Sequence, residues 1–177
     1  NLQVACESFP ALNGFAKVKD DKYWFIPRID YDASTYTSTQ HGIYYRADWA
    51  KQFGYDKMDC IDENKVLLSE VKQMYLDFSQ KDPDGNGVAD TYGLGAHGEI
   101  TGLNIIWGWW GVDSSGWFLD DDGLYKPGYT NEKLIEVLTW FQDLYKAGAM
   151  DPEFTNNDYK ATVAKAAVGT VGAFSRQ

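Results

Sequence analysis

The stretch Asp82-Pro83-Asp84-Gly85-Asn86-Gly87-Val88-Ala89-Asp90 carries oxygen-bearing side chains at positions one, three, five and nine of a nine-residue run. A glycine stands at position six, where the calcium loop of an EF-hand needs a sharp turn. Calcium is a hard cation that takes six to eight oxygen ligands at about 2.3–2.6 Å. The stretch therefore predicts a calcium site, with ligands from the side chains of Asp82, Asp84, Asn86 and Asp90 and from the backbone carbonyl of Val88.

The loop departs from an EF-hand at position twelve, where a bidentate Glu is required and this chain has Gly93. Asp90 would then have to complete the coordination shell. A plain polar turn is the alternative, because Asp-Gly and Asn-Gly pairs favour turns without any ion. If calcium binds, we expect a structural role: it would hold the end of the preceding helix to the strand that follows near Tyr92.

Four further motifs surround the loop, and their order is specific. They are Tyr44-Tyr45-Arg46-Ala47-Asp48-Trp49-Ala50 followed by Phe53-Gly54, then Thr91-Tyr92-Gly93-Leu94, Leu144-Tyr145-Lys146-Ala147-Gly148, and Met150-Asp151-Pro152-Glu153-Phe154. With the loop, this order resembles the extracellular (family 1) solute-binding proteins of ABC importers, in the branch that binds alginate and other oligosaccharides. The resemblance covers about residues 22–175. Two features depart from it: residues 55–63 replace the usual Pro-Thr-x-Asp/Glu helix start, and Thr91 stands where many relatives carry another acidic calcium ligand.

The resemblance implies an α/β, periplasmic-binding-protein-like (type II) fold with two lobes that close on a carbohydrate. Such a protein is a monomer that delivers an oligosaccharide to ABC permease membrane subunits and catalyses no reaction. It resides at the cell surface on a lipid anchor, or in the periplasm. Because these proteins are more than twice as long as this 177-residue chain, we expect mostly one lobe. Residues 1–42 would form an N-terminal segment with a hinge-crossing strand, and residues 43–177 the α/β lobe that carries the calcium loop.

Hydrophobic periodicity predicts alternating strands and helices, which also indicates an α/β fold. We expect strands at 23–29, 42–46 and 168–174, a hairpin at 117–126 that turns at 121–123, and helices at 46–53, 62–80, 101–111, 130–147 and 155–166. The buried stripe of the 62–80 helix should be Leu67, Leu68, Val71, Met74, Tyr75 and Phe78. That of the 130–147 helix should be Leu134, Val137, Leu138, Phe141, Leu144 and Tyr145, with Gly148 as its C-cap.

Composition excludes several functions. The net charge is −10, from 26 acidic and 16 basic residues, which argues against nucleic-acid binding and against a strongly anionic ligand.

The histidines, His41 and His97, have no zinc-type spacing, and we expect His97 to have a surface or loop role. Cys6 and Cys60 also lack metal-type spacing; a disulfide is possible, and two free thiols are the favoured interpretation. No run of about twenty apolar residues could span a membrane.

Aromatic residues make up 16% of the chain, which fits either a ring-rich core or a carbohydrate-binding surface. In the 101–111 helix, Leu103, Ile106, Trp107 and Trp110 share one face, which should be buried. Trp109 points the other way, and we expect it to stack on a sugar ring with help from Tyr44 and Arg46. Two alternatives stay open: Trp109 could pack against a neighbouring loop, and Arg46 could form an ion pair with Asp48.

Two other functions compete with a transport binding protein. The many acidic residues could include a glycosidase pair, so the chain could be a fragment of a calcium-stabilised carbohydrate hydrolase, although no spacing identifies two of them. A calcium-dependent interaction module such as a dockerin would repeat its calcium loop, and this chain has one copy.

Overall fold

The computed structural model describes residues 42–56, 66–98, 101–114 and 116–176. The chain divides after Thr39, so all of these residues belong to the unit Gln40–Gln177. The expected strand at 23–29, the residues Cys6, His41 and Cys60, and most of the expected segment 1–42 lie outside the described residues. Within the described part, no helix combines the length and the apolar character needed to cross a membrane.

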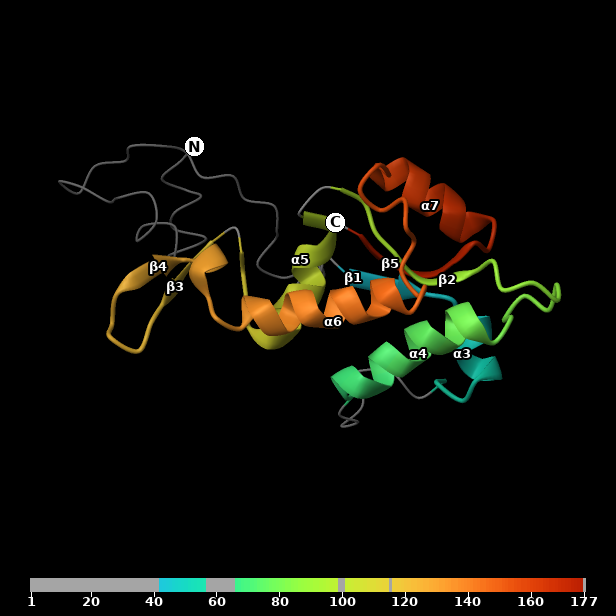
Figure 1. Ribbon diagram of the computed structural model, residues 1–177, viewed down its shortest axis with the longest axis horizontal. Helices are drawn as coiled ribbons and strands as arrows, with labels where there is room; N and C mark the ends of the chain where they lie inside the picture. The colour runs from blue at the N-terminus through green and yellow to red at the C-terminus, as the bar shows by residue number, and fades with distance from the viewer. Residues whose placement is uncertain (1–41, 57–65, 99–100, 115, 177) are drawn as a thin grey trace, which may run out of the picture. The chain divides into compact units, whose positions relative to one another are not determined.

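Strands and helices alternate along the described chain, as expected for an α/β fold (Figure 1). In order they are β1 (Gly42–Tyr45), α3 (Ala47–Gln52), α4 (Leu68–Gln80), β2 (Tyr92–Gly95), α5 (Thr101–Trp107), the 3-10 helix η1 (Gly108–Trp110), β3 (Trp117–Leu119), β4 (Tyr125–Pro127), the 3-10 helix η2 (Gly128–Thr130), α6 (Leu134–Lys146), α7 (Tyr159–Ala167) and β5 (Val171–Arg176).

The helices α6 and α7 begin later than the sequence predicts, and a side-chain cap explains the start of α7. Before α6, the Oδ1 of Asn131 accepts a hydrogen bond from the backbone N–H of Lys133 at 3.0 Å, after the separate turn η2. Before α7, the Oδ1 of Asp158 accepts one from Ala161 N–H at 2.7 Å. Asp158 is the N-cap of α7, and a side-chain acceptor at that position satisfies a backbone donor that has no partner inside the helix. The N-cap of α6 is Lys133, whose side chain makes no capping hydrogen bond, so Asn131 belongs to the turn before that helix.

The three-stranded sheet has the order β1-β5-β2, with β5 antiparallel to β1 and parallel to β2. The register pairs Tyr44 with Phe174, and Leu94 with Ala173. A further parallel bridge joins Leu94 to Met150. In Figure 1 the sheet lies between α7 on one side and α4 on the other, so its central strand is covered on both faces.

The helix α4 packs on β2 in the opposite direction to the strand. The Thr91 hydroxyl donates to the Phe78 carbonyl at 2.7 Å, and a Cβ on Gly93 would lie only 1.9 Å from the Tyr75 carbonyl oxygen. The helix α4 and the strand β2 are therefore antiparallel. The loop 82–90 consequently lies at the amino end of β2, and the first turns of α4 lie toward its carboxyl end.

The predicted buried stripes are correct at their centres and wrong at their edges. On α4, Met74, Tyr75 and Phe78 are buried, and Leu67 is 56% exposed. On α6 the buried side chains are Val137, Trp140, Phe141 and Leu144, whereas Leu138 and Tyr145 are 52% and 49% exposed. The buried face of α6 consists of residues 137, 140, 141 and 144, which is a complete helical face. Because Trp140 belongs to this face, Leu138 and Tyr145 point toward solvent.

A buried carboxylate ties the end of α3 to α4. The side chain of Asp77 accepts hydrogen bonds from Tyr55 Oη at 2.7 Å, from Gln73 Nε2 at 2.8 Å and from Lys81 Nζ at 2.8 Å. Desolvation alone would raise the pKa of Asp77, but these hydrogen bonds lower it below the ordinary value. The same site raises the pKa of Tyr55 to about 12, through desolvation first and then through its hydrogen bond to Asp77.

The Tyr55 contact predicts a specific alkaline loss of stability. Because the pKa of Tyr55 is raised on folding, its contribution is complete below the unfolded value of about 10 and is lost as the pH rises through about 12. Urea unfolding should therefore show wild type more stable than Tyr55→Phe at pH 9, with the difference shrinking toward pH 12. A difference that stays constant over this range would contradict the shift.

Candidate functional site

The loop between α4 and β2 gathers the side chains that the sequence predicts as calcium ligands. Asp82 accepts hydrogen bonds from the backbone N–H of Asn86 at 3.1 Å and of Gly87 at 2.9 Å. The Asn86 amide Nδ2 donates to Asp84 at 2.9 Å and to Asp90 at 3.2 Å. Backbone φ is positive at Gly85 and Gly87, and also at Asp82, where it is 48°. Asp82, Asp84 and Asp90 therefore all hydrogen-bond to Asn86, Asp82 through the Asn86 backbone and the other two through the Asn86 side chain.

The ligand geometry is not complete in this arrangement. Among the residues that the structure describes, no group of three or more His, Cys, Asp or Glu side chains is placed to hold a metal ion. Asn86 turns its amide nitrogen toward the carboxylates, and its Oδ1 accepts from Val88 N–H at 2.7 Å. Ligation through Oδ1 would need this amide to rotate. The donor set itself, three carboxylates and an amide, has the chemistry that calcium prefers.

Arg46 forms the ion pair with Asp48 that the sequence left open as an alternative. Its Nε lies 3.0 Å from Asp48 Oδ1, and its guanidinium lies 4.9 Å from the centre of the Trp49 ring. The hydrogen bonds to Asp48 raise the pKa of Arg46, and Asp84 of the loop adds to the shift. Arg46 therefore lies near the loop, at the amino end of the parallel strands β2 and β5.

Tyr44 lies on the same edge of the sheet as Arg46. Its ring is 50% exposed and stacks on Phe174 with 5.6 Å between ring centres. Tyr44 and Arg46 line one shallow hollow together with the end of α7 and with β5. The structure thus brings these two predicted ligand residues together.

Trp109 is not among the residues that line the Tyr44–Arg46 hollow. Its ring is 38% exposed and meets Trp140 of α6 edge to face, with 6.2 Å between ring centres. The predicted opposite face is confirmed as core, since Ile106 and Trp107 are buried and Leu103 and Trp110 pack against them. Trp140 also contacts Trp110 at 5.7 Å, so these three indoles form one cluster, which the sequence did not predict because it missed the burial of Trp140.

Two buried tryptophans keep an unpaired donor. The indole Nε1 atoms of Trp107 and Trp140 have no hydrogen-bond partner among the described residues. A buried donor without an acceptor costs about 1–3 kcal/mol, and native proteins contain few of them. The Trp140 donor belongs to a residue that lines a second hollow, between α4, η1 and α6.

His97 lies in the loop after β2, which agrees with the loop role that the sequence predicts, but it is buried rather than on the surface. It stands two residues after the end of β2 at Gly95 and is only 4% exposed. Its ring meets Tyr159 edge to face at 6.1 Å, and its Nδ1 has no hydrogen-bond partner among the described residues. The burial of His97 could not be inferred from the sequence, because the stretch Gly95-Ala96-His97-Gly98 has no apolar periodicity.

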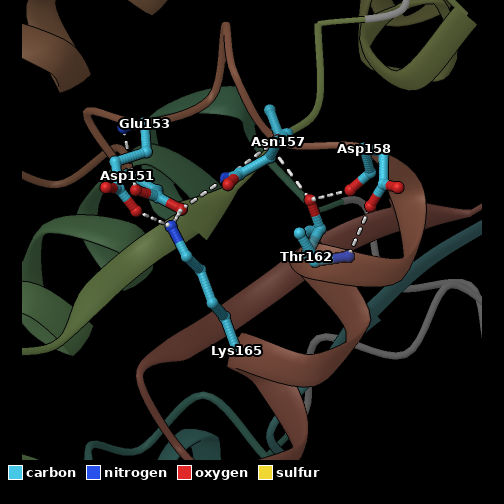
Figure 2. A network of polar contacts seen from close by, with 8 residues as sticks. Asp151, Glu153, Asn157, Asp158, Thr162 and Lys165 are labelled. Carbon is cyan, nitrogen blue, oxygen red and sulfur yellow. Dashed lines mark hydrogen bonds and ion pairs between the residues drawn. The ribbon is translucent and has the colours of Figure 1, made fainter.

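A polar network fastens the turn after Met150 to α7 (Figure 2). Asp151 is 1% exposed, and its Oδ2 accepts from Lys165 Nζ at 2.7 Å and from Asn157 Nδ2 at 2.8 Å. The Thr162 hydroxyl donates to the Ala96 carbonyl at 3.1 Å. These contacts fix α7 against the carboxyl end of β2, which explains in physical terms why Asp151 is buried in a turn.

The chain resembles a bacterial lipoprotein in sequence. It is 29% identical over 118 residues to lipoprotein LipO of Bacillus subtilis (strain 168), a match that spans 64% of this chain and 22% of LipO. No family model matches the chain. The similarity to LipO is therefore confined to a minor part of that protein.

Three solved proteins share the fold over nearly the whole chain. The first is an HMO-binding, ABC-transporter-associated solute-binding protein from Bifidobacterium longum infantis, with a TM-score of 0.74 and 13% identity; the match covers 99% of this chain and 37% of that chain. The second is the S. pneumoniae ABC-transporter substrate-binding protein FusA in complex with kestose, with a TM-score of 0.68 and 18% identity; the match covers 99% of this chain and 36% of that chain. The third is the alginate-binding protein AlgQ2 without calcium ion, with a TM-score of 0.65 and 18% identity; the match covers 98% of this chain and 33% of that chain. FusA has also been solved as an EF-hand mutant.

These solved proteins are binding proteins rather than enzymes. The present chain spans about a third of their length, which agrees with an α/β unit that forms only part of such a protein. The match covers 99% of the chain at a TM-score of 0.74, so the expected α/β fold is confirmed. The chain has the fold of ABC-transporter solute-binding proteins, over about a third of the length of the structures it matches.

Proposed function

We propose that this chain belongs to the substrate-binding component of an ABC importer, which captures a carbohydrate and delivers it to the permease without reacting with it. The observation that carries the proposal is the fold match over 99% of the chain to a solute-binding protein. The names of the matched proteins refer to HMO, to kestose and to alginate, so an oligosaccharide is the ligand class we propose. The similarity to a lipoprotein supports a cell-surface location on a lipid anchor.

We propose a neutral oligosaccharide, because the chain carries a net charge of −10 and such a field disfavours anionic ligands. The proposed contacts remain Trp109, Tyr44 and Arg46. The exposure of the Trp109 and Tyr44 rings supports their assignment. Arg46 is already paired with Asp48, so its part would be to hold the wall of the Tyr44 hollow. The proposed division stays at 1–42 for a hinge-crossing segment and 43–177 for the lobe, which would act as a monomer.

We also propose that the loop 82–90 binds one structural calcium ion. The side chains of Asp82, Asp84, Asn86 and Asp90 and the carbonyl of Val88 would hold it. The convergence of three carboxylates on Asn86 supports this set. The bond from Thr91 to Phe78 already joins the loop's end to α4, so the ion would reinforce an existing contact between the helix and β2.

Calcium should therefore raise the melting temperature of the wild-type chain. At a hundredfold excess over the dissociation constant, a ligand of the native state adds about 2.7 kcal/mol, or roughly 5–10 °C for a chain of this size. Asp84→Ala removes a charged ligand from an exposed loop and should abolish the calcium-dependent rise while leaving the calcium-free melting temperature nearly unchanged. Differential scanning fluorimetry with calcium and with chelator measures both; a wild-type curve that chelator does not move would identify a plain turn.

A turnover assay separates the binding protein from its alternative, a fragment of a calcium-stabilised hydrolase. The chain should be incubated with chromogenic glycosides and with neutral trisaccharides, and the products analysed by chromatography. We expect every sugar to be recovered intact. Steady, protein-dependent release of product would overturn the proposed function. The Trp109→Ala variant is the control for a contaminating glycosidase: if a contaminant cleaves the sugar, the variant preparation should release as much product as the wild type.

A further inference from the structure

We infer that one face of the β3–β4 hairpin is a docking surface for a segment of the full-length protein that lies outside this chain. Opposite residues of an antiparallel pair share a face, and Trp117 pairs with Pro127 and Leu119 with Tyr125. Alternate residues of a strand also share a face, so these four side chains form one apolar surface, the hairpin face. Trp117, Leu119 and Tyr125 are 68%, 58% and 73% exposed. Among the described residues, the core cluster includes none of the four.

The hairpin is held in place at its base. The backbone N–H of Gly128 donates to the Gly116 carbonyl at 2.8 Å, and a Cβ at Gly128 would collide with the Asp113 carbonyl oxygen. In Figure 1 the hairpin projects beyond the end of α6 that lies farther from the three-stranded sheet. The hairpin face is therefore presented by a fixed element, away from the core that surrounds the sheet.

Such a ribbon gains stability when its apolar face is covered. An isolated two-stranded hairpin is marginally stable in water, and each strand here has three residues. On the opposite face Lys126 forms an ion pair with Asp120 at 2.5 Å, so the ribbon has one polar and one apolar side. A large exposed apolar patch on a soluble protein usually marks an interaction site, and Trp and Tyr are enriched at the centres of interfaces.

The size of the hairpin face favours a partner within the same polypeptide. Two exposed aromatic rings and a leucine present roughly 400 Å², about half of the ~800 Å² per partner that a stable complex of separate proteins buries. A segment of the same polypeptide needs less area, because it loses less translational and rotational freedom on docking. This chain covers 37% of the matched HMO-binding protein, so a protein of that length has more than half of its residues available to supply the cover.

Charge indicates the chemistry of the covering segment. The turn of the hairpin carries Asp120, Asp121 and Asp122 next to the hairpin face, and the last two are exposed. Three carboxylates argue against docking on a lipid surface, whose headgroups include anionic ones. Complementary charge would favour an apolar segment flanked by Lys or Arg. This inference goes beyond the proposed function, because it rests on the fold match and on the hairpin and not on any ligand.

Photo-crosslinking in the full-length protein tests the hairpin face directly. Benzoylphenylalanine replaces Tyr125 in one sample and, as the control, Tyr145 of α6, which is 49% exposed; mass spectrometry then identifies the adducts. We expect the probe at position 125 to join a segment outside residues 1–177 of the same molecule, and the probe at position 145 not to join that segment. An adduct between two molecules, an adduct confined to residues 1–177, or no adduct at position 125 would overturn the inference.

A matched pair of leucine variants gives a second readout. Leu119 and Leu138 are 58% and 52% exposed in this chain. In the full-length protein, Leu119→Lys should lower the melting temperature by about 3 °C or more, and Leu138→Lys should change it by less than about 1 °C. In the 177-residue chain neither variant should move it by more than about 1 °C. A loss from Leu119→Lys in the 177-residue chain, or no loss in the full-length protein, would contradict the inference. No sugar enters either experiment, so either failure leaves the proposed function standing.

Discussion

The Trp107→Ala variant should lose about 3–5 kcal/mol of unfolding free energy, the usual cost of truncating a buried tryptophan. Trp107 is 9% exposed at the end of α5 and belongs to the same core cluster as Ile106 and Val137. Its replacement leaves a cavity that the neighbouring rings cannot close, since interiors are packed to near-crystalline density. Urea unfolding followed by far-UV circular dichroism measures the loss.

Trp109→Ala is the matched control, because the two residues are neighbours in sequence with opposite environments. Trp109 is 38% exposed and touches the core mainly through Trp140. We expect this variant to lose less than about 1.5 kcal/mol of stability and to lose sugar affinity instead. If Trp109→Ala destabilised the chain as much as Trp107→Ala and kept its affinity for sugar, the two faces of this segment would be assigned the wrong way round.

The Lys165→Met variant should be destabilised by about 3 kcal/mol, because it leaves the carboxylate of Asp151 buried without its cation. Asp151 is 1% exposed and lies 2.7 Å from Lys165 Nζ. It keeps hydrogen bonds from Asn157 Nδ2 and from the backbone of Glu153, which places the expected loss at the lower end of the range for broken buried pairs. Adding Asp151→Asn to Lys165→Met should recover part of this stability.

The same contact has a pH dependence with a definite sign. Desolvation lowers the pKa of Lys165, but the hydrogen bonds to Asp151 and Glu153 outweigh it and raise the pKa above the ordinary value. The stabilisation is therefore complete below about pH 10.4 and is lost as the pH rises through the raised value. Glu153→Gln removes only the exposed half of the contact and should cost less than about 1 kcal/mol. An equally large loss in this control would assign the effect to the surface pair.

Local chemistry made most of the fold predictable. Pro83 and the Asp-Gly and Asn-Gly pairs end α4 and start the loop, and the spacing of Met74, Tyr75 and Phe78 gives the buried face of α4. Gly148, with φ at 72°, ends α6 as its sequence position predicts. These features depend on neighbours within a few residues, so one sequence is sufficient to infer them.

Features set by contacts between distant segments were not predictable. The burial of Trp140 depends on Trp110 of η1 and Tyr75 of α4, and the burial of His97 depends on Tyr159 of α7. The sequence grouped Trp109 with Tyr44 and Arg46, although Trp109 does not line the hollow of the other two. Periodicity along one helix does not report which other element covers it, and for that reason the sequence could not show which of the candidate ligand residues share a hollow.

The most direct test of the central claim, that this chain captures a neutral oligosaccharide without reacting with it, is isothermal titration calorimetry with kestose, maltotriose and trigalacturonate. We predict saturable binding of at least one neutral sugar and none of the anionic one. The affinity should be weak, because ligands of two-lobed binders are buried from both sides of the cleft, whereas this chain covers 37% of the matched HMO-binding protein. An absence of heat with every neutral oligosaccharide tested at millimolar concentration, or saturable binding of the anion alone, would contradict the account.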